Sequence, residues 1–310
     1  CISARCARSI NNAKSSTIGA ARIESRHKKL ILNMTEVAKE LNLVPSILLF
    51  NIHSKSITRG EAPTCLTSKS QKEGLVKNLG IEIIYSIDFD ENLMKLQADE
   101  FVKNILVEKL NTKLVVVGFD YRFGHKASGD VETLKELGNK YGFRVIVIDP
   151  VYLDDTIVSS TKIRELLMDG KLEVANTMLG RNYQMIGKVI DGNKVGRKLG
   201  FPTANLELID NFTVPKLGVY RTKTIVDGKT YLSASSIGYT PTFKNDKIKI
   251  ESHIIDFNEK IYDKVLYLEF IEYLRGELKF EKLDDLIDQI DNDIRTVLSR
   301  HWIIKTFDMR

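Results

Sequence analysis

The 310-residue sequence contains few cysteines, and none is spaced for bonding to another or to a metal. Cys1, Cys6 and Cys65 are an odd number of thiols with neither paired nor zinc-like spacing. This pattern argues against a disulfide framework and against a structural zinc site. A protein that does not depend on disulfides fits a reducing compartment, so we expect a cytoplasmic location.

Long apolar runs and blocks of one charge are also absent. No stretch approaches the ~18 consecutive apolar residues of a membrane span, so we expect no membrane segment. Lys and Arg number 46 against 41 Asp and Glu, which gives a net charge of +5. So small a surplus fits anionic small molecules as well as nucleic acid, but without a Lys/Arg block we expect no nucleic-acid partner.

The rest of the composition is that of an ordinary globular protein. Hydrophobic residues make up 43% of the chain and charged residues 28%. At ~100–200 residues per domain, the length predicts two domains, each with enough apolar material for its own core. The sequence contains no internal repeat and no low-complexity tract.

Residues 1–23 differ from the rest because they contain four basic residues but no Asp or Glu, and they are rich in Ser, Ala and Asn. An organelle transit segment has this composition, and an arbitrary or damaged leader is the alternative. The first residue is Cys1 rather than Met, which indicates a truncated or processed start. We expect no secretory signal, because no apolar core region appears.

Helix-like and strand-like patterns alternate from residue 25 to about residue 180. The strand-like segments are continuous apolar runs, which is typical of strands buried on both faces. This alternation predicts a Rossmann-like α/β domain, a parallel sheet with helices on both faces. The expected helices are 28–41, 70–79, 98–110 and 131–141, and the expected strands are 46–50, 81–87, 113–117 and 144–148.

Beyond residue 180 the strand-like segments shorten, and Gly and Tyr become frequent. Asp227-Gly228 lies between two of these segments and is a strong hairpin signal. Short strands with turn signals predict a small antiparallel β-barrel, and 283–298 reads as a C-terminal amphipathic helix. We therefore expect two domains, 1–180 and 181–310. The expected barrel strands are 184–190, 218–226, 229–237, 249–257 and 264–273.

The stretch 187–206 combines glycines with basic residues. Glycines let the backbone turn tightly and approach a ligand closely, and exposed N–H groups beside positive charge can cradle phosphate oxygens. An ordinary hairpin is the alternative, because Gly-Lys turns are common in hairpins. The glycines are Gly187, Gly192, Gly196 and Gly200, and the basic residues are Lys194, Arg197 and Lys198.

Pro202-Thr203-Ala204-Asn205 follows this stretch and supplies two neutral oxygens. In an extended segment, the side chains of Thr203 and Asn205 point to the same face. Two such ligands leave room for water and nucleotide phosphates around a Mg²⁺ ion. The alternative is a plain turn, since Pro, Thr and Asn all favour turns.

Three further side chains are candidates for chemistry. Glu251 and His253 alternate in the strand-like I-E-S-H-I-I-D-F, and an inward-facing Glu is a candidate general base, whereas on a solvated face it is an ordinary charge. Arg275 follows another strand-like segment. It either holds a planar or anionic ligand or lies on the surface as an ordinary charge.

Residues from about 179 to 293 resemble the riboflavin kinase module of bacterial bifunctional riboflavin kinase/FAD synthetases. The matching strings occur in the family's order and cover nearly the whole half. The resemblance implies a six-stranded barrel that converts riboflavin and ATP into FMN and ADP. The strings are L-G-R-N-Y, G-K-V-I-D-G, G-R-K-L-G-F-P-T-A-N-L, G-V-Y, S-I-G-Y-T-P-T-F, E-S-H-I-I-D-F and L-R-G-E-L-K-F.

The resemblance also implies roles for single residues. Thr203 and Asn205 match the family's Mg²⁺–ATP motif, and Glu251 matches the base that takes the proton of the ribityl 5′-hydroxyl. Arg275 lies in the loop that covers the flavin. These roles suit phosphoryl transfer, which needs a metal, positioning and a base but no covalent nucleophile. The residues that match the ATP-binding loops are Gly187, Lys188, Gly192, Gly196, Arg197 and Pro202.

Two stretches of the N-terminal half place polar groups where ligands bind in parallel sheets. A Gly-rich, aromatic and basic loop follows the strand expected at 113–117, at its C-terminal end. V-S-S-T-K-I-R at 158–164 precedes a helix whose N–H groups, with Lys162 and Arg164, can bind an anion. A plainly capped helix is the alternative.

These stretches, with L-T-S-K-S-Q-K-E, resemble the FMN adenylyltransferase half of the same family, which implies formation of FAD and pyrophosphate from FMN and ATP. Asp120, Ser160 and Arg164 match residues of that site. His53 lies in F-N-I-H-S, where the family usually has F-x-P-H-P, so the flanking prolines are missing. His27 matches the last residue of a further signature.

That signature, G-x-F-D-G-V-H-x-G-H, follows the family's first strand, and its two His stabilise phosphate charge. The matching window is 18–27, I-G-A-A-R-I-E-S-R-H, in which only His27 survives. Glu24 replaces the first His and Arg26 the Gly, and the preceding segment has no convincing strand pattern. A damaged or mis-assembled N-terminal sequence is one explanation, and an organelle-targeted variant with a modified site is the other.

The sequence thus predicts a two-domain enzyme of flavin biosynthesis with riboflavin, FMN and ATP as substrates. The first alternative is a monofunctional riboflavin kinase with an inactive adenylyltransferase half. The second is a non-enzymatic, flavin- or nucleotide-responsive regulator, although neither a helix-turn-helix pattern nor a basic stripe is present.

Overall fold

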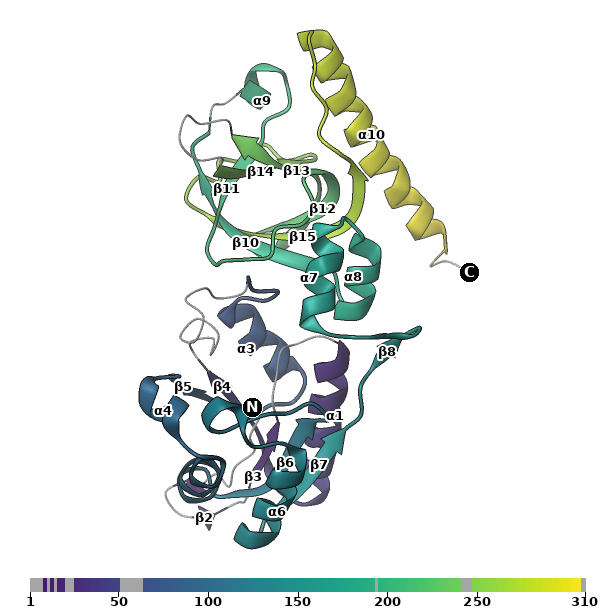
Figure 1. The fold of residues 1–310 in the computed structure, drawn as a ribbon. Helices are drawn as coiled ribbons and strands as arrows, with labels where there is room; N and C mark the ends of the chain where they lie inside the picture. The colour runs from purple at the N-terminus through teal and green to yellow at the C-terminus, as the bar shows by residue number, and fades with distance from the viewer. Residues whose placement is uncertain are drawn as a thin grey trace. The chain divides into compact units, whose positions relative to one another are not determined.

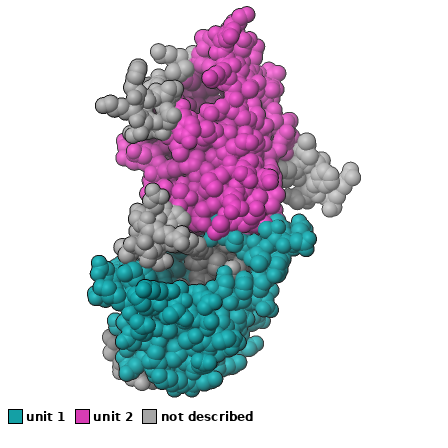
Figure 2. All heavy atoms as spheres, in the orientation of Figure 1, with its two compact units in different colours: residues 1–63, 69–160 teal, residues 64–68, 161–310 magenta. Residues whose placement is uncertain are grey.

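The structure is a computed structural model. It describes residues 8–9, 12–13, 16–19, 25–50, 64–192, 195–240 and 247–307, with side chains from 28–50, 64–192, 196–197, 199–239 and 248–300. The chain forms two compact units, residues 1–63 with 69–160 and residues 64–68 with 161–310 (Figure 2). The second unit thus includes two helices that precede the sequence-based boundary at 180, which stays a prediction.

The first unit is built on parallel strands, as the sequence predicts (Figure 1). β6 (Thr112–Gly118) pairs with β3 (Ser16–Gly19) on one side and with β7 (Arg144–Ile148) on the other. β4 (Val44–Phe50) pairs with β5 (Ile83–Ile87), and β3 also contacts β4. Short antiparallel pairs join β1 (Arg8–Ser9) to β2 (Asn12–Ala13) and β8 (Tyr152–Leu153) to β9 (Thr156–Ile157).

β3 corrects the sequence-based expectation, in which no convincing strand preceded the window 18–27. Thr17 pairs with Leu114 and Ile18 with Val115, so this segment is a parallel strand beside β6. A four-residue strand, S-T-I-G, has too few apolar positions for a pattern, and its pairing with the buried β6 is what identifies it.

Helices cover this sheet and complete its core. They are α1 (Ser25–Glu40), α3 (Lys69–Asn78), α4 (Glu91–Lys95), α5 (Ala98–Glu100), the π-helix η1 (Phe101–Lys109), the 3-10 turn η2 (His125–Ala127) and α6 (Val131–Tyr141). Apolar residues of α1, η1 and α6 pack with β4 and β6 in one buried cluster. The Asp130 carboxylate caps α6 by accepting from the Thr133 N–H at 3.0 Å, and Gly142 ends the helix with φ of 76°.

The second unit is a closed six-stranded barrel with the order β10-β11-β14-β13-β12-β15, and all its pairings are antiparallel. This confirms the predicted barrel and adds β11, which the sequence indicated only as an extended segment. The strands are β10 (Tyr183–Ile190), β11 (Ala204–Leu208), β12 (Gly218–Val226), β13 (Lys229–Thr240), β14 (Lys247–Ile254) and β15 (Val265–Arg275).

Among the described residues, helices α7 to α10 accompany the barrel. α8 (Leu172–Leu179) contacts β10 and β15, and α7 (Ser160–Met168) precedes it in the chain. The short α9 (Val195–Lys198) is the next helix after β10 in the chain. The predicted C-terminal helix is confirmed as α10 (Leu283–Phe307), which lies along the outside of the barrel against β13 (Figure 1). Among the helices of the described residues, none combines the length and apolar character needed to cross a bilayer.

The barrel interior contains a closed ring of hydroxyl groups. The five side chains come from β12, β13 and β14, and each is fully buried. Consecutive members are 2.7–3.0 Å apart, so every hydroxyl has a partner on either side. Such a ring satisfies polar groups that would be costly to bury alone. In order around the ring, the members are Thr222, Ser233, Thr224, Ser252 and Ser235.

Opening this ring is expected to destabilise the barrel. Ser235→Ala removes one of the two ring partners of both Thr222 and Ser252, so the free energy of unfolding is expected to fall by about 1–3 kcal/mol. Denaturant unfolding measures this loss. Ser299→Ala, at an exposed position of α10, is the control and is expected to change stability by less than about 0.5 kcal/mol. Equal midpoints for the two variants would contradict the expectation.

Candidate active site

The strand register of the barrel brings the predicted metal motif next to the predicted base. β11 pairs with β14 so that Asn205 lies opposite Glu251. The Thr203 hydroxyl, two residues before Asn205, donates to Glu251 Oε1 at 3.3 Å. Asn205 is nine-tenths buried, whereas Glu251 keeps about a quarter of its side chain exposed. Residues 48 positions apart in the chain thus share one face of the barrel.

Two glycines of the 187–206 stretch lie directly against this motif. A Cβ at Gly192 would lie within 2.7 Å of Asn205 Oδ1, and one at Gly196 would collide with the Phe201 carbonyl and lie 3.4 Å from Thr203 Oγ1. The missing side chains therefore leave a cradle around the Thr203 and Asn205 oxygens. Neutral oxygens in such a cradle suit Mg²⁺ that also binds phosphates. Within the described residues, no cluster of three or more His, Cys, Asp or Glu is arranged to hold a metal.

His253 supports the turn that carries Thr203. Its Nδ1 atom is 2.9 Å from the Pro202 carbonyl, and its ring packs edge-on against Phe201 with centroids 5.9 Å apart. His253 and Glu251 alternate on β14, so the strand that carries the predicted base also holds the Pro202–Asn205 segment. The sequence indicated His253 as a neighbour of the predicted base but could not identify its hydrogen-bond partner.

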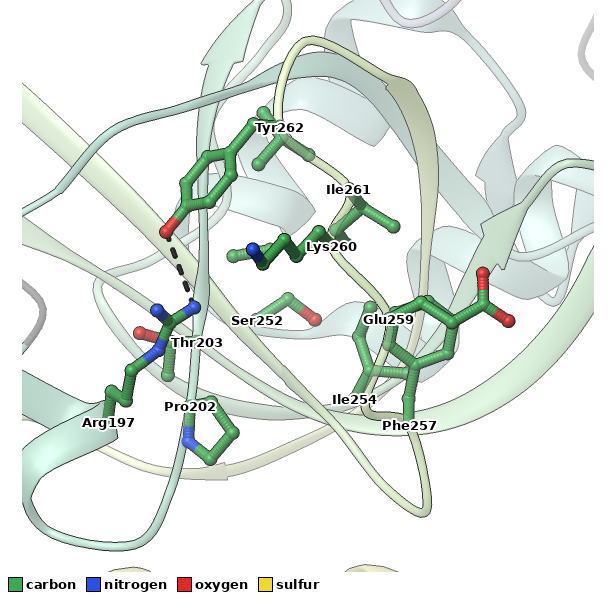
Figure 3. Close-up of a pocket in the computed structure, with 12 residues that line it drawn as sticks. Arg197, Pro202, Thr203, Ser252, Ile254, Phe257, Glu259, Lys260, Ile261 and Tyr262 are labelled. Atoms are coloured by element: carbon green, nitrogen blue, oxygen red, sulfur yellow. Dashed lines mark hydrogen bonds between the residues drawn. The ribbon is translucent and has the colours of Figure 1, made fainter.

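A pocket opens beside Thr203, between the turn at 197–204 and the loop that follows β14 (Figure 3). The Arg197 guanidinium donates to the Tyr262 hydroxyl at 3.4 Å across it. Cations and aromatic rings together suit the phosphates and the base of a nucleotide. The sequence provided no indication that the segment 257–262 lines this pocket. The lining residues are Val189, Arg197, Pro202, Thr203, Ala204, Ser252, Ile254, Phe257, Glu259, Lys260, Ile261 and Tyr262.

Gly187 and Lys188 lie on β10 and do not line this pocket. Lys188 is on the exposed side of the strand, and its ammonium is 2.7 Å from Asp263 Oδ1. The hydrogen bond that Lys188 donates to the Asp263 carboxylate raises the pKa of Lys188. A Cβ at Gly187 would lie 3.0 Å from the Glu207 carbonyl oxygen. The absence of a side chain at this position therefore allows β10 and β11 to pack closely. Their roles at the nucleotide stay predictions, and Lys194 lies outside the described residues.

Arg275, which the resemblance places in a flavin-covering loop, is bound to the C-terminal helix. Its Nε and Nη2 atoms donate to the two carboxylate oxygens of Asp293 on α10 at 3.0 and 2.7 Å. Its Nη1 donates to the Gly276 carbonyl at 2.9 Å, and Gln289 also donates to Asp293. Arg275 thus fixes the chain after β15 to α10, and contact with flavin stays a prediction.

The adenylyltransferase residues are described only in part. Asp120 is exposed just after the carboxyl end of β6, and Ser160 is a buried residue at the start of α7. Arg164, on α7 in the second unit, donates from Nε to the Thr64 carbonyl at 2.8 Å. The backbone of His27 belongs to α1, but its side chain, like Glu24 and His53, lies outside the described residues.

Comparison with known proteins finds two family models on this chain. One, described as FAD synthetase, matches residues 25–162, and the other, described as riboflavin kinase, matches residues 179–300. Together they cover most of both halves.

Relatives along nearly the whole chain carry the name bifunctional riboflavin kinase/FMN adenylyltransferase. Those from Buchnera aphidicola subsp. Schizaphis graminum and Listeria monocytogenes are each 36% identical, over 87% and 86% of this chain and 88% and 85% of their own. The one from Escherichia coli K12 is 30% identical over 86% of both chains. A crystal structure titled macrolide-efflux protein, from Streptococcus pneumoniae, is 29% identical, covers 90% of this chain and 92% of its own, and has a TM-score of 0.82.

Proposed function

Because the chain belongs to the family of bifunctional riboflavin kinase/FMN adenylyltransferases, we propose that its barrel unit carries out the kinase reaction at Thr203, Asn205 and Glu251. The hydrogen bond between Thr203 and Glu251 is the observation that carries this assignment, since it joins the metal motif to the base. The parallel-sheet half would then supply the adenylyltransferase reaction. Riboflavin, FMN and ATP follow as substrates from the family.

In the proposed kinase reaction, Glu251 accepts the proton of the ribityl 5′-hydroxyl as that oxygen bonds to the γ-phosphorus of ATP. The bond from the γ-phosphorus to the β,γ-bridging oxygen breaks, and ADP leaves. Thr203 Oγ1 and Asn205 Oδ1 would hold Mg²⁺, which when bound neutralises phosphate charge. His253 keeps the Pro202 carbonyl, and with it Thr203, in place.

The neighbouring pocket is proposed to take ATP. Arg197 and Lys260 supply positive charge for the phosphates, and the rings of Phe257 and Tyr262 supply apolar surface for the base. Thr203 lines the same pocket, so a nucleotide here has its phosphates next to the proposed metal ligands.

The adenylyltransferase assignment depends more on resemblance than on geometry. We propose that the FMN phosphate attacks the α-phosphorus of ATP and that pyrophosphate leaves. Asp120 is supported by its place at the carboxyl end of a parallel strand, where ligands bind in such sheets. Ser160, Arg164, His27 and His53 are carried over from the family's motifs.

Chromatographic separation of flavins after incubation with riboflavin and MgATP tests the proposal as a whole. Formation of FMN and then FAD is the expected result. FMN alone would support the monofunctional alternative, and no conversion in a folded protein would support a regulator.

The metal motif makes a separate prediction. Thr203→Ala and Asn205→Ala are each expected to weaken the affinity for MgADP while riboflavin affinity changes less, because these oxygens bind the metal only together with nucleotide phosphates. Titration of each ligand into the two variants measures this. Equal loss of both affinities would instead indicate that the turn after Pro202 no longer folds correctly.

A further inference from the structure

The carboxylate of Glu251 is held at both of its oxygens. Besides the Thr203 hydroxyl on Oε1, the ammonium of Lys249 lies 2.7 Å from Oε2. Lys249 and Glu251 are two residues apart on β14, so their side chains emerge from the same face of the strand. The sequence pattern alone indicates Glu251 and His253 in this alternating series but gives no signal for Lys249.

This ion pair contributes little to the stability of the fold. The side chains of Lys249 and Glu251 are 35% and 26% exposed, and ion pairs that water can reach are weak. The ion pair instead fixes the orientation of the Glu251 carboxylate. A carboxylate bound at a single oxygen can turn about its last bond, whereas one bound at both oxygens by groups from different segments cannot. A general base needs such fixed placement relative to the hydroxyl it deprotonates.

We propose that Lys249 is a positioning residue of the kinase reaction, which holds the Glu251 carboxylate in one orientation beside Thr203. The inference rests on the proposed role of Glu251 as the base. Lys249 acts through Glu251 and leaves the binding of riboflavin and MgATP to other residues. A lysine that contacted the transferred phosphate directly would behave differently, because its effect would persist without Glu251.

Steady-state kinetics of FMN formation tests the role. Lys249→Gln is expected to lower kcat on the order of 10-fold, with KM for riboflavin and MgATP changed less than about 2-fold. Lys249→Arg, which keeps a cation on the strand, is expected to restore most of the rate. Lys264→Gln is the matched control, because Lys264 is 36% exposed and pairs with Asp227 at 2.6 Å elsewhere on the barrel. It is expected to leave kcat unchanged.

A double-mutant cycle separates positioning from direct contact. In the Glu251→Gln background, Lys249→Gln is expected to cause no further loss of kcat, since the group it holds is already gone. If the losses of kcat in the two single variants multiplied in the double variant, the proposal would be overturned, and Lys249 would instead contact the substrate directly. An unchanged kcat in Lys249→Gln would also overturn it, provided Glu251→Gln is impaired. Full activity in Glu251→Gln would instead show that Glu251 is not the general base, which contradicts the proposed function itself. Unchanged MgADP affinity and melting temperature establish that the variants fold.

Discussion

Glu251→Gln is expected to lower the rate of FMN formation by about 10²-fold or more, while the affinity for MgADP stays nearly unchanged. General-base catalysis commonly supplies ~10²–10⁴ of an enzyme's rate, and an amide cannot accept the ribityl proton. The substitution keeps the size of the side chain and an oxygen that can accept from Thr203. The measurement is kcat for FMN formation together with MgADP titration.

Glu207→Gln provides the control, because Glu207 is an exposed residue of β11 that lies outside the proposed machinery. Its turnover is expected to match that of the unmodified chain. If Glu251→Gln also turned over at the full rate, Glu251 would have no part in the mechanism, and the proton would leave through solvent or the nucleotide.

Much of the fold can be predicted from the sequence, because its strongest elements carry local signals. β6 contains three consecutive valines, Val115 to Val117, and is buried along almost its entire length. α6 has an amphipathic pattern, a capping Asp130 and a terminal Gly142, so its bounds match the expected 131–141. β3 and α9 have no such signals. Both are four residues long, and β3 is stabilised by pairing with a strand almost 100 residues later.

The candidate site divides in the same way. Thr203, Asn205 and Glu251 can be predicted because their side-chain chemistry and spacing suit Mg²⁺ and proton transfer, and strand alternation alone puts members of each segment on one face. Contacts between side chains that depend on strand register or on the position of a distant helix cannot be predicted from the sequence. The Thr203–Glu251 contact depends on how β11 pairs with β14, and the Arg275–Asp293 pair depends on where α10 returns to the barrel.

Residues 18–27 depart from the family signature, and this departure predicts slow adenylyl transfer. The structure shows which elements flank these residues. β3 ends at Gly19 and α1 begins at Ser25, so this window runs from the carboxyl end of a parallel strand to a helix start. Ligand phosphates favour that place in such sheets, because N–H groups at a helix start are unpaired. In the family, two His of the signature stabilise phosphate charge here.

Glu24 is expected to oppose that function. Two like charges ~4 Å apart at an effective dielectric constant of ~20 repel each other by about 4 kcal/mol before relaxation, and a carboxylate beside the phosphate would add a repulsion of this order. The loss of even one stabilising donor commonly lowers the rate by ~10²–10³-fold. We therefore expect the chain to form FMN much faster than it converts FMN to FAD.

Restoring the signature is expected to reverse this imbalance. A variant with residues 18–27 rebuilt to the family pattern, including Glu24→His and Arg26→Gly, should convert FMN to FAD at least about 10²-fold faster than the unmodified chain, because Asp120, Ser160 and Arg164 match the family. The assay is FAD formation from FMN and MgATP in both proteins. FMN formation from riboflavin is the internal control and is expected to be equal, since the residues of the proposed kinase site lie in a different unit from Glu24 and Arg26. Efficient conversion by the unmodified chain would show that the window is misaligned and that His27 or His53 stabilises the phosphate charge in another arrangement.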